Sequence, residues 1–392
     1  MTQPSVPSPR PKPAKLTLYR YRLPLRQAFE HFAASREINE GLLVVLTLAD
    51  GTVGLGEGVP RSYVTGETVE SALAVVRDLY APRLASPEPL AEGPLEGSAY
   101  GVWHNAAWCA CELAYLDAWS RAAESPLADF LGRLLGLPVS RKIRPHAAGV
   151  ISADTPEAIR RSILRMRIWG MHDFKLKVGM PGDRENLWAC YQKLRRGLGR
   201  RRLTLRVDAN GAWSADEARI TCQWMKGFAV TVVEQPLPKG DEADLSRLRR
   251  ETGMPVMLDE SLIDRPSAEK LAQAGAADFW NLRVSKNGGL LQTLRLADLA
   301  RANKIGICVG AMVGESGILS AAARTLLLLV PEVRFVENSY GKHILAEDLV
   351  QESTHFGYGG RLRPLRGPGL GVTLDEAVME RRAERVADIP LA

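Results

Sequence analysis

The stretch Thr204–Trp213 reads T-L-R-V-D-A-N-G-A-W, and both the fold and the site that we predict start from it. A short β-rich run ends on Asp208, and Asn210 stands two residues further on. Val and Thr favour strands, whereas Asn and Gly favour turns. We therefore interpret the stretch as a strand that carries one carboxylate at its carboxyl end.

Similar apolar runs that end in a charged residue recur on either side of this stretch. They are F-K-L-K-V-G with Lys175 and Lys177, V-V-E-Q-P with Glu234, M-L-D-E-S with Asp259, and N-L-R-V-S-K-N-G-G with Lys286. The intervals from Lys177 to Asp208 and onward along this series are 31, 26, 25 and 27 residues. A strand, a loop, a helix and a return take a comparable length, so each run is predicted to open one strand–helix unit.

The same alternation continues through the second part of the chain. The predicted strands are His146–Ile151, Asp173–Lys177, the runs that end at Asp208, Glu234 and Asp259, Phe279–Leu282, Gly306–Val309 and Arg334–Val336. The predicted helices are Pro156–Trp169, Arg184–Leu198, Ser214–Lys226, Asp244–Glu251, Ser267–Ala274, Leu290–Ala302 and Ser316–Leu329. Eight β runs that alternate with helices predict an α/β fold with a parallel TIM-like barrel at residues 144–364. In such a barrel the charged strand ends surround a shared site.

The first part of the chain has a different pattern, which predicts an α+β unit at residues 15–143. The predicted strands are Leu16–Leu23, Gly41–Leu48 and Thr52–Gly56, the loops are Arg26–Arg36 and Pro60–Gly66, and the helices are Thr68–Tyr80, Ala106–Arg121 and Leu127–Leu135. Residues 1–14 are rich in Pro and lack an apolar run, so we expect a disordered arm there and no secretory signal.

The composition of the 392 residues is that of a soluble globular protein, with 46% apolar and 24% charged residues. The five cysteines form no C-x-x-C pair, which favours a reduced compartment, and we expect a cytoplasmic protein. No apolar run approaches the roughly 18 residues of a membrane span. The net charge of +6 comes largely from Arg195–Arg202, which we interpret as a solvated helix end and not as a nucleic-acid surface. A modest basic excess suits a small anionic substrate.

Three of the strand ends supply carboxylates from consecutive units, namely Asp208, Glu234 and Asp259. Three carboxylates that converge repel one another, and a divalent cation relieves this repulsion. A set of oxygen ligands without histidine favours a hard ion such as Mg²⁺, or Mn²⁺ in its place, over zinc.

The lysines supply the other half of the predicted chemistry. Lys175 and Lys177 stand two residues apart, so both side chains leave their strand on the same face. Two neighbouring cations disfavour each other's charged form, so we expect a lowered lysine pKa and a general base at this pair. Lys286 enters three units further round the barrel, across the mouth.

A metal and two lysines suit removal of the proton α to a carboxylate, because the metal stabilises the enediolate that forms. Bases on two opposite faces allow racemisation or epimerisation. One base with the other lysine as a cationic stabiliser allows syn elimination or cycloisomerisation. The spacing of the residues leaves both alternatives open.

The ordered set of residues resembles the enolase superfamily and, within it, the muconate-lactonizing-enzyme subgroup. That subgroup has K-x-K on the second barrel strand, metal-ligating Asp, Glu and Asp on the next three, and Lys on the sixth. The resemblance implies that Lys177 is the base on one face and Lys286 the base or cationic partner on the other. It also implies that Lys175 tunes Lys177 and contacts the substrate carboxylate, and that Asn210 and Glu260 surround the metal site.

The resemblance extends beyond the site to Gly54–Gly58, Leu113–Asp117, Val313–Ser316 and Gly367–Thr373. It implies a (β/α)7β barrel under a capping domain built from residues 15–143 and the tail at about 365–392. It also implies a homo-oligomer. The cap loops and the barrel loops would set specificity through His31, Phe32, Arg61, Tyr63, Glu315 and Glu337.

The departures from related patterns narrow the expected activity. Mandelate racemases need a His after strand seven, where this chain has Cys308-Val-Gly310. Dipeptide epimerases carry D-x-D at strand eight, where this chain has Glu337-Asn-Ser339. We expect a Mg²⁺-dependent isomerase or lyase: an N-acylamino acid racemase, an o-succinylbenzoate synthase or a muconate cycloisomerase. The alternatives are a dipeptide epimerase and, in a different class, a non-catalytic carboxylate-binding barrel.

Overall fold

The computed structural model describes residues 11–31, 34–84, 104–141, 146–152, 155–200 and 202–391, with only the backbone at 28–31 and 34–35. Most of the predicted disordered arm at residues 1–14 lies outside the described residues. Phe32 and the side chain of His31, two of the predicted specificity residues, also lie outside them.

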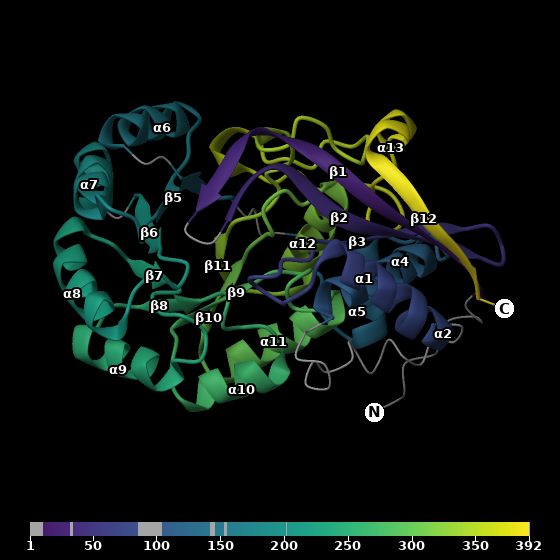
Figure 1. The fold of residues 1–392 in the computed structure, drawn as a ribbon, viewed down its shortest axis with the longest axis horizontal. Helices are drawn as coiled ribbons and strands as arrows, with labels where there is room; N and C mark the ends of the chain where they lie inside the picture. The colour runs from purple at the N-terminus through teal and green to yellow at the C-terminus, as the bar shows by residue number, and fades with distance from the viewer. Residues whose placement is uncertain are drawn as a thin grey trace.

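Eight parallel strands follow one another in chain order around a single sheet, which confirms the predicted barrel fold (Figure 1). A hydrogen bond of 2.8 Å from Ala148 N to Val336 O joins the two ends of this sheet. The carboxyl ends of all the strands therefore meet at one end of the barrel. The strands are β4 (Gly149–Ile151), β5 (Asp173–Lys177), β6 (Thr204–Asp208), β7 (Val232–Glu234), β8 (Val256–Leu258), β9 (Phe279–Leu282), β10 (Gly306–Val309) and β11 (Val333–Val336).

A helix follows each strand from β4 to β10, and the helices lie on the outside of the strands (Figure 1). Their bounds are α6 (Pro156–Ile168), α7 (Asp183–Gly199), α8 (Ala215–Met225), α9 (Glu242–Thr252), α10 (Arg265–Gln273), α11 (Leu290–Ala302) and α12 (Gly317–Leu329). Short 3-10 helices are η3 (Lys226–Phe228), η4 (Gly341–His343) and η5 (Tyr358–Gly360). Side-chain caps at Thr155, Ser214, Asp264 and Ser316 fix four of the helix starts close to the predicted positions.

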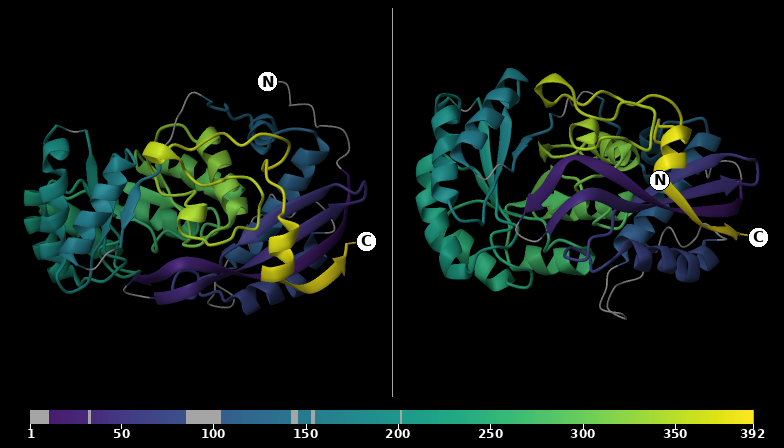
Figure 2. Two further views of the ribbon diagram at one scale, coloured as in Figure 1. Left: turned by 90° about the horizontal axis from the view of Figure 1, so that it is seen from above. Right: turned by 45° about the horizontal axis from the view of Figure 1, so that its top comes forward.

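A four-stranded antiparallel sheet forms beside the barrel, in the order β12-β1-β2-β3 (Figure 2). Its strands are β1 (Pro13–His31), β2 (Ala34–Leu48), β3 (Val53–Gly58) and β12 (Ala383–Pro390). The helices of this part are α1 (Val69–Val75), the π-helix η1 (Val76–Tyr80), α2 (Ala81–Arg83), α4 (Asn105–Ala122), α5 (Leu127–Leu135) and α13 (Glu376–Arg382). Because β12 pairs with β1, the carboxyl-terminal segment is an edge strand of the amino-terminal sheet. The boundaries that we placed between the two domains stay a prediction.

The predicted loop at Arg26–Arg36 is instead the end of a long β1–β2 hairpin, in which Phe29 pairs with Arg36. We predicted a loop because the side chains are polar and aromatic, but an antiparallel ribbon pairs its backbone whatever its side chains. The ribbon rests on the segment after β11, where Arg26 N donates to Ile344 O at 2.7 Å. It therefore extends from the sheet toward the barrel mouth (Figures 1 and 2).

The G-L-G-E-G stretch lets β3 lie directly against the backbone of α4. A Cβ added at Gly54, Gly56 or Gly58 would stand only 1.8–2.2 Å from a carbonyl oxygen of that helix. The three oxygens belong to Ala114, Ala110 and Ala106. Two residues of strand advance about 6.6 Å and four residues of helix about 6 Å, so successive glycines meet successive turns.

Two buried carboxylates join this sheet to more distant segments. Asp117 of α4 accepts from Leu55 N at 2.9 Å and from Leu370 N at 2.6 Å, which ties the carboxyl-terminal region to β3. Glu57 of β3 accepts from Ser316 N at 2.9 Å and from Leu319 N at 3.0 Å. Glu57 thus caps α12 of the barrel from the neighbouring sheet. Buried apolar side chains of both parts form one continuous core.

Glu67 gives α4 the cap that His104, at its start, does not provide. Its carboxylate accepts from Ala106 N at 3.0 Å and from Ala107 N at 3.1 Å, and Thr65 Oγ1 donates to it at 2.7 Å. Burial raises the pKa of Glu67 to about 7, although these hydrogen bonds oppose the shift.

We expect Gly56→Ala to lower the free energy of unfolding by about 3 kcal/mol or more, because the new methyl group overlaps Ala110 O. Urea denaturation measures this change. The matched control is Gly199→Ala in α7, where nothing lies within 4 Å of an added Cβ. Helix propensity alone predicts that the control gains at most about 1 kcal/mol. Equal stability of the two variants would contradict the close approach of β3 to α4.

The raised pKa of Glu67 predicts a pH-dependent contribution to stability. The folded protein holds this proton more tightly than the unfolded chain, whose carboxyl has an ordinary pKa of 4.5. The stabilisation is complete below pH 4.5 and is lost as the pH rises through 7. The unfolding free energy, relative to that of Glu67→Gln, should therefore fall by about 3 kcal/mol between pH 4.5 and pH 8. Urea denaturation across this range would show a constant difference if Glu67 had an ordinary pKa.

Candidate active site

Three carboxylates stand at the carboxyl ends of neighbouring strands. Asp208 ends β6 and Glu234 ends β7, where the two residues pair in register, and Asp259 follows β8 directly. The parallel ladder thereby delivers all three side chains to the same edge of the barrel. Their exposed fractions are at most 1%, so their charges require partners inside the protein.

Lys175 lies among these carboxylates. Its Nζ is 3.1 Å from Glu234 Oε2 and 3.2 Å from Asp208 Oδ2, and it also contacts Glu337 Oε2. Burial alone would lower the pKa of Lys175, but the three carboxylates outweigh it and raise the pKa well above its usual value. The lowered pKa that we predicted for this lysine pair is therefore wrong for Lys175. Carboxylates, and not Lys177, dominate its surroundings.

Lys177 shares the face of β5 with Lys175, as predicted, but reaches further out. Its Nζ donates to Asp208 Oδ2 at 2.8 Å and to Asn210 Oδ1 at 2.7 Å. Its side chain is 18% exposed, against 4% for Lys175. Lys177 is thus the β5 lysine that can meet a ligand at the mouth.

The carboxylates of β6 and β7 have opposite pKa shifts. Burial would raise the pKa of Asp208, but Lys177 and Lys175 outweigh it and hold the pKa well below its ordinary range. Burial and the charge of Asp208 raise the pKa of Glu234 to about 8. An added cation beside Glu234 would favour its ionised form.

The segment after β9 brings two cations to Asp259. Lys286 Nζ donates to Asp259 O at 2.7 Å, to Asp259 Oδ1 at 2.8 Å and to Asn281 O at 2.8 Å. Arg283 Nη2 contacts Asp259 Oδ2 and lies 3.8 Å from Glu234 Oε1. The structure thus brings Lys286 to the predicted site, but beneath the carboxylate and not at the open mouth.

Glu337, a predicted specificity residue, is held by two cations from the barrel interior. Lys175 contacts its Oε2 and Arg206 its Oε1. Burial would raise the pKa of Glu337, but these two cations lower it to about 2. Arg206 also lies 3.1 Å from Asp173 Oδ2. Both carboxylate oxygens of Glu337 are therefore occupied within the protein.

The donor set at this edge suits a hard divalent cation, although the carboxylates are now paired with lysines and arginine. Within the ranges that the structure describes, no three His, Cys, Asp or Glu side chains form a ready-made metal-binding group. The oxygens nevertheless fit such an ion in number and chemistry. Asn210 Nδ2 donates to Glu260 Oε1 at 2.9 Å, whereas the buried Glu260 Oε2 has no hydrogen-bond partner. That unsatisfied oxygen is a further sign that the site suits a cation.

The predicted specificity residues of the cap loop serve partly to anchor it. Arg61 is buried, and its guanidinium donates to Asn39 Oδ1 and, at 3.1 Å, to Val313 O. Tyr63 is half-buried, and its hydroxyl accepts from Arg36 Nη2 at 3.1 Å. The loop therefore connects β2 with the segment that follows β10.

The same loop also rests on the segment after β7, where Lys239 Nζ donates to Val64 O at 2.7 Å. Glu315, another predicted specificity residue, accepts from Met312 N at 2.6 Å, and burial raises its pKa to about 8. The cap loop thus touches the barrel mouth on two sides.

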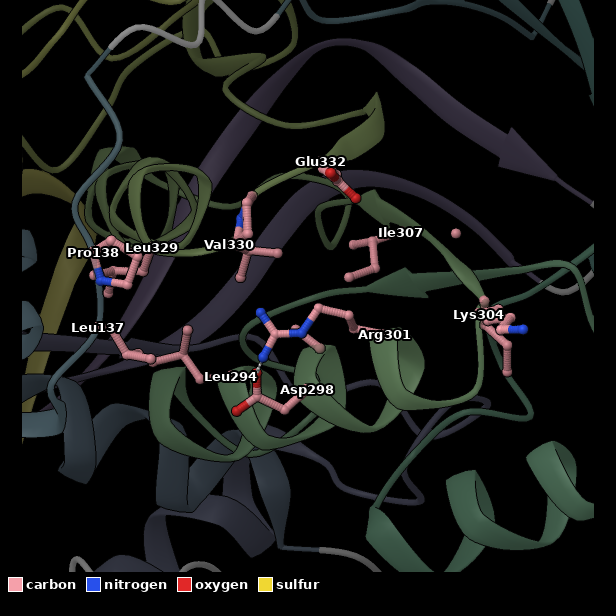
Figure 3. Close-up of a pocket in the computed structure, with 14 residues that line it drawn as sticks. Leu137, Pro138, Leu294, Asp298, Arg301, Lys304, Ile307, Leu329, Val330 and Glu332 are labelled. Atoms are coloured by element: carbon pink, nitrogen blue, oxygen red, sulfur yellow. Dashed lines mark hydrogen bonds and ion pairs between the residues drawn. The ribbon is translucent and has the colours of Figure 1, made fainter.

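A pocket of about 390 Å³ lies away from these residues, at the amino-terminal end of β10 (Figure 3). Apolar side chains such as Leu294 and Leu329 line it, and Arg301 Nη2 pairs with Asp298 Oδ1 at 2.7 Å beside it. It contains none of the predicted site residues. None of the helices in the described ranges has the length and apolar character needed to cross a bilayer.

Sequence reasoning missed Arg283 and Arg206, although both stand in the quoted motifs. Arg283 is the first residue after β9 in N-L-R-V-S-K, and a strict strand-end rule would have selected it before Lys286. Arg206 lies inside T-L-R-V-D, where a charge two residues before Asp208 must share its face of the strand.

Comparisons with known proteins identify the family of the chain. The family model "Enolase C-terminal domain-like" matches residues 158–378. The chain is 30% identical to a chloromuconate cycloisomerase of Cupriavidus pinatubonensis over 86% of this chain and 90% of that protein. It is 28% identical to the L-Ala-D/L-Glu epimerase of Bacillus subtilis over 78% and 82% of the two chains.

A solved structure has the same architecture over nearly all of this chain. It is the muconate lactonizing enzyme of Pseudomonas fluorescens complexed with muconolactone, which has a TM-score of 0.84 and 27% identity over 95% of this chain and 100% of that one. With the family-model match and the cycloisomerase identity, this shows that the chain is an isomerase or lyase of the enolase superfamily, in its muconate-lactonizing-enzyme subgroup.

Proposed function

We propose that this enzyme removes the proton α to a carboxylate of a small-molecule substrate, with Lys177 as the base and Mg²⁺ as its metal. The observation that carries the proposal is the set of carboxylates on β6, β7 and β8 beside the Lys177 ammonium, 2.8 Å from Asp208. Metal ligands and a base at adjacent strand ends can act on adjacent atoms of one bound molecule.

The two lysines of β5 have different proposed roles. Lys177 is held by Asp208 and Asn210 and reaches the mouth, so its amine, once deprotonated, takes the proton from the substrate carbon. Lys175 keeps its charge among the carboxylates of Glu234 and Glu337. With three carboxylates on its ammonium, Lys175 has no free N–H donor, so it positions these carboxylates and Lys177 and does not itself bind the substrate carboxylate.

Asp208, Glu234 and Asp259 would hold Mg²⁺, or Mn²⁺ in its place, with Asn210 and Glu260 around them. When bound, the metal supplies positive charge for the enediolate that loss of the proton creates.

The candidate substrates are N-acylamino acids and succinylbenzoate-like acids, which carry a hydrogen α to a carboxylate, and muconates. A muconate carries such a hydrogen only as its lactone, so Lys177 would supply the proton as the ring closes and remove it as the ring opens. A dipeptide is less well matched, because Glu337, the acid nearest to the D-x-D position, already has both oxygens paired with Lys175 and Arg206. A non-catalytic binding barrel would bind such an acid without exchanging its α-hydrogen. Assembly as a homo-oligomer stays a prediction.

We expect the enzyme in D₂O with Mg²⁺ to exchange the α-hydrogen of at least one acid from a library of muconates in their lactone form, N-acylamino acids, dipeptides and sugar acids. Lys177→Met should lower that exchange rate by about 10²–10⁴-fold, the usual contribution of a general base. Proton NMR measures the exchange. The matched control is Lys193→Met, an exposed residue of α7, which should retain the full rate. No exchange with any acid in the library would refute the proposed function.

Loss of a proposed ligand should weaken metal binding independently of any substrate. Asp259→Asn removes one anionic oxygen, and we expect Mg²⁺ affinity to fall at least about tenfold by titration calorimetry. Glu251→Gln, at an exposed position of α9, provides the control and should bind Mg²⁺ as the unaltered protein does. Equal affinity of all three proteins would place the metal elsewhere.

A further inference from the structure

The segment after β9 stands directly across the barrel from Lys177. Lys177 ends β5, and β9 is four strands further round a closed sheet of eight. Four steps in a ring of eight lead to the opposite side. Whatever cation this segment presents at the mouth therefore faces the other side of a substrate that Lys177 contacts.

Lys286 cannot be that cation, because it has no capacity left for a ligand. An ammonium group has three N–H donors, and those of Lys286 are taken by Asp259 O, Asp259 Oδ1 and Asn281 O at 2.7–2.8 Å. Its side chain is 0% exposed. Lys286 thus fixes the backbone and carboxylate of Asp259 from below.

Arg283, in contrast to Lys286, is partly exposed. Its side chain is 13% exposed, close to the 18% of Lys177, whereas Lys175 and Lys286 are at most 4% exposed. Arg283 Nη2 lies on Asp259 Oδ2, and the buried Nε has no hydrogen-bond partner. Of the four cations that touch the carboxylates of β6, β7 and β8, Lys177 and Arg283 are the two that approach the open mouth.

We propose that Arg283, in place of Lys286, is the cation that faces Lys177, and that the enzyme is consequently a one-base catalyst. This inference rests on the proposed function. A guanidinium does not give up its proton in proteins, so it can stabilise negative charge but cannot remove a proton from the second face of a carbon. The reaction class is then syn elimination or cycloisomerisation, and not racemisation.

The proton balance follows from a single amine. The Lys177 amine takes the α-proton and becomes an ammonium, and the electron pair of the C–H bond moves into the substrate carboxylate to give the enediolate. The same ammonium then returns its proton to the same face of the carbon, or to a leaving group on that face as the bond to it breaks. Arg283 donates hydrogen bonds to the anion throughout and exchanges no proton.

The test follows both enantiomers of a chiral acid that the exchange screen identifies, with Mg²⁺ in D₂O, by NMR and chiral chromatography. We expect the unaltered enzyme to exchange one enantiomer with its configuration kept. Arg283→Lys places a group that can lose a proton opposite Lys177, and we expect formation of the other enantiomer to rise at least tenfold. Arg283→Met should slow exchange at least tenfold while the configuration is still kept.

Arg301→Lys, a surface substitution with the same chemical change, is the matched control and should leave rate and configuration unaltered. Inversion by the unaltered enzyme would overturn the one-base proposal while leaving the proposed function intact. Absence of inversion in Arg283→Lys, or an unchanged rate in Arg283→Met, would overturn the position assigned to Arg283. Failure of every acid to exchange would instead remove the proposed function itself.

Discussion

The structure depends on the pairing of buried charges at one end of the barrel. Carboxylates without partners would cost several kcal/mol each at this depth, so the fold must bring cations to them at the same time. The strands and the residues just after them supply both the carboxylates and the cations. Lys175 lies between Asp208 and Glu234, and Arg283 lies between Glu234 and Asp259. Each of these cations therefore pairs with carboxylates of two adjacent strands, and removing it would leave both carboxylates with one partner fewer. A divalent cation at this edge would have to compete with these internal cations.

The sheet beside the barrel is positioned by a different set of constraints. Backbone-to-backbone contact at Gly56, the Glu57 cap on α12 and the Asp117 bonds to Leu55 and Leu370 are all buried and leave little freedom of placement. Because the sheet is fixed in this position, the loop that contains Arg61 lies at the barrel mouth. Specificity in such an arrangement depends on two surfaces, one from the sheet and one from the barrel, that meet at the site.

The barrel and its three carboxylates could be predicted from the sequence, because an apolar run that ends in a charged residue indicates both a strand and the end of that strand that faces the site. Other features could not be predicted, because their sequence pattern does not indicate both the structure and the position of the residues. The β1–β2 ribbon reads as a loop, since a hairpin that projects from a sheet has no buried face to impose alternation. The pairing of Glu337 with Arg206 was likewise not predictable, since Arg206 comes from the middle of another strand.

Arg283 and Lys286 differ in their surroundings more than in their place in the sequence. The two residues are three positions apart, both are cations, and both touch Asp259. One is sealed beneath the carboxylate and the other reaches the mouth, a difference that burial and donor count reveal and that spacing does not. A cation that can lose its proton gives the opposite face of the substrate a second base, and a guanidinium there does not. If Arg283 faces Lys177 as we propose, the site has a single base and the reaction keeps the configuration of the α-carbon.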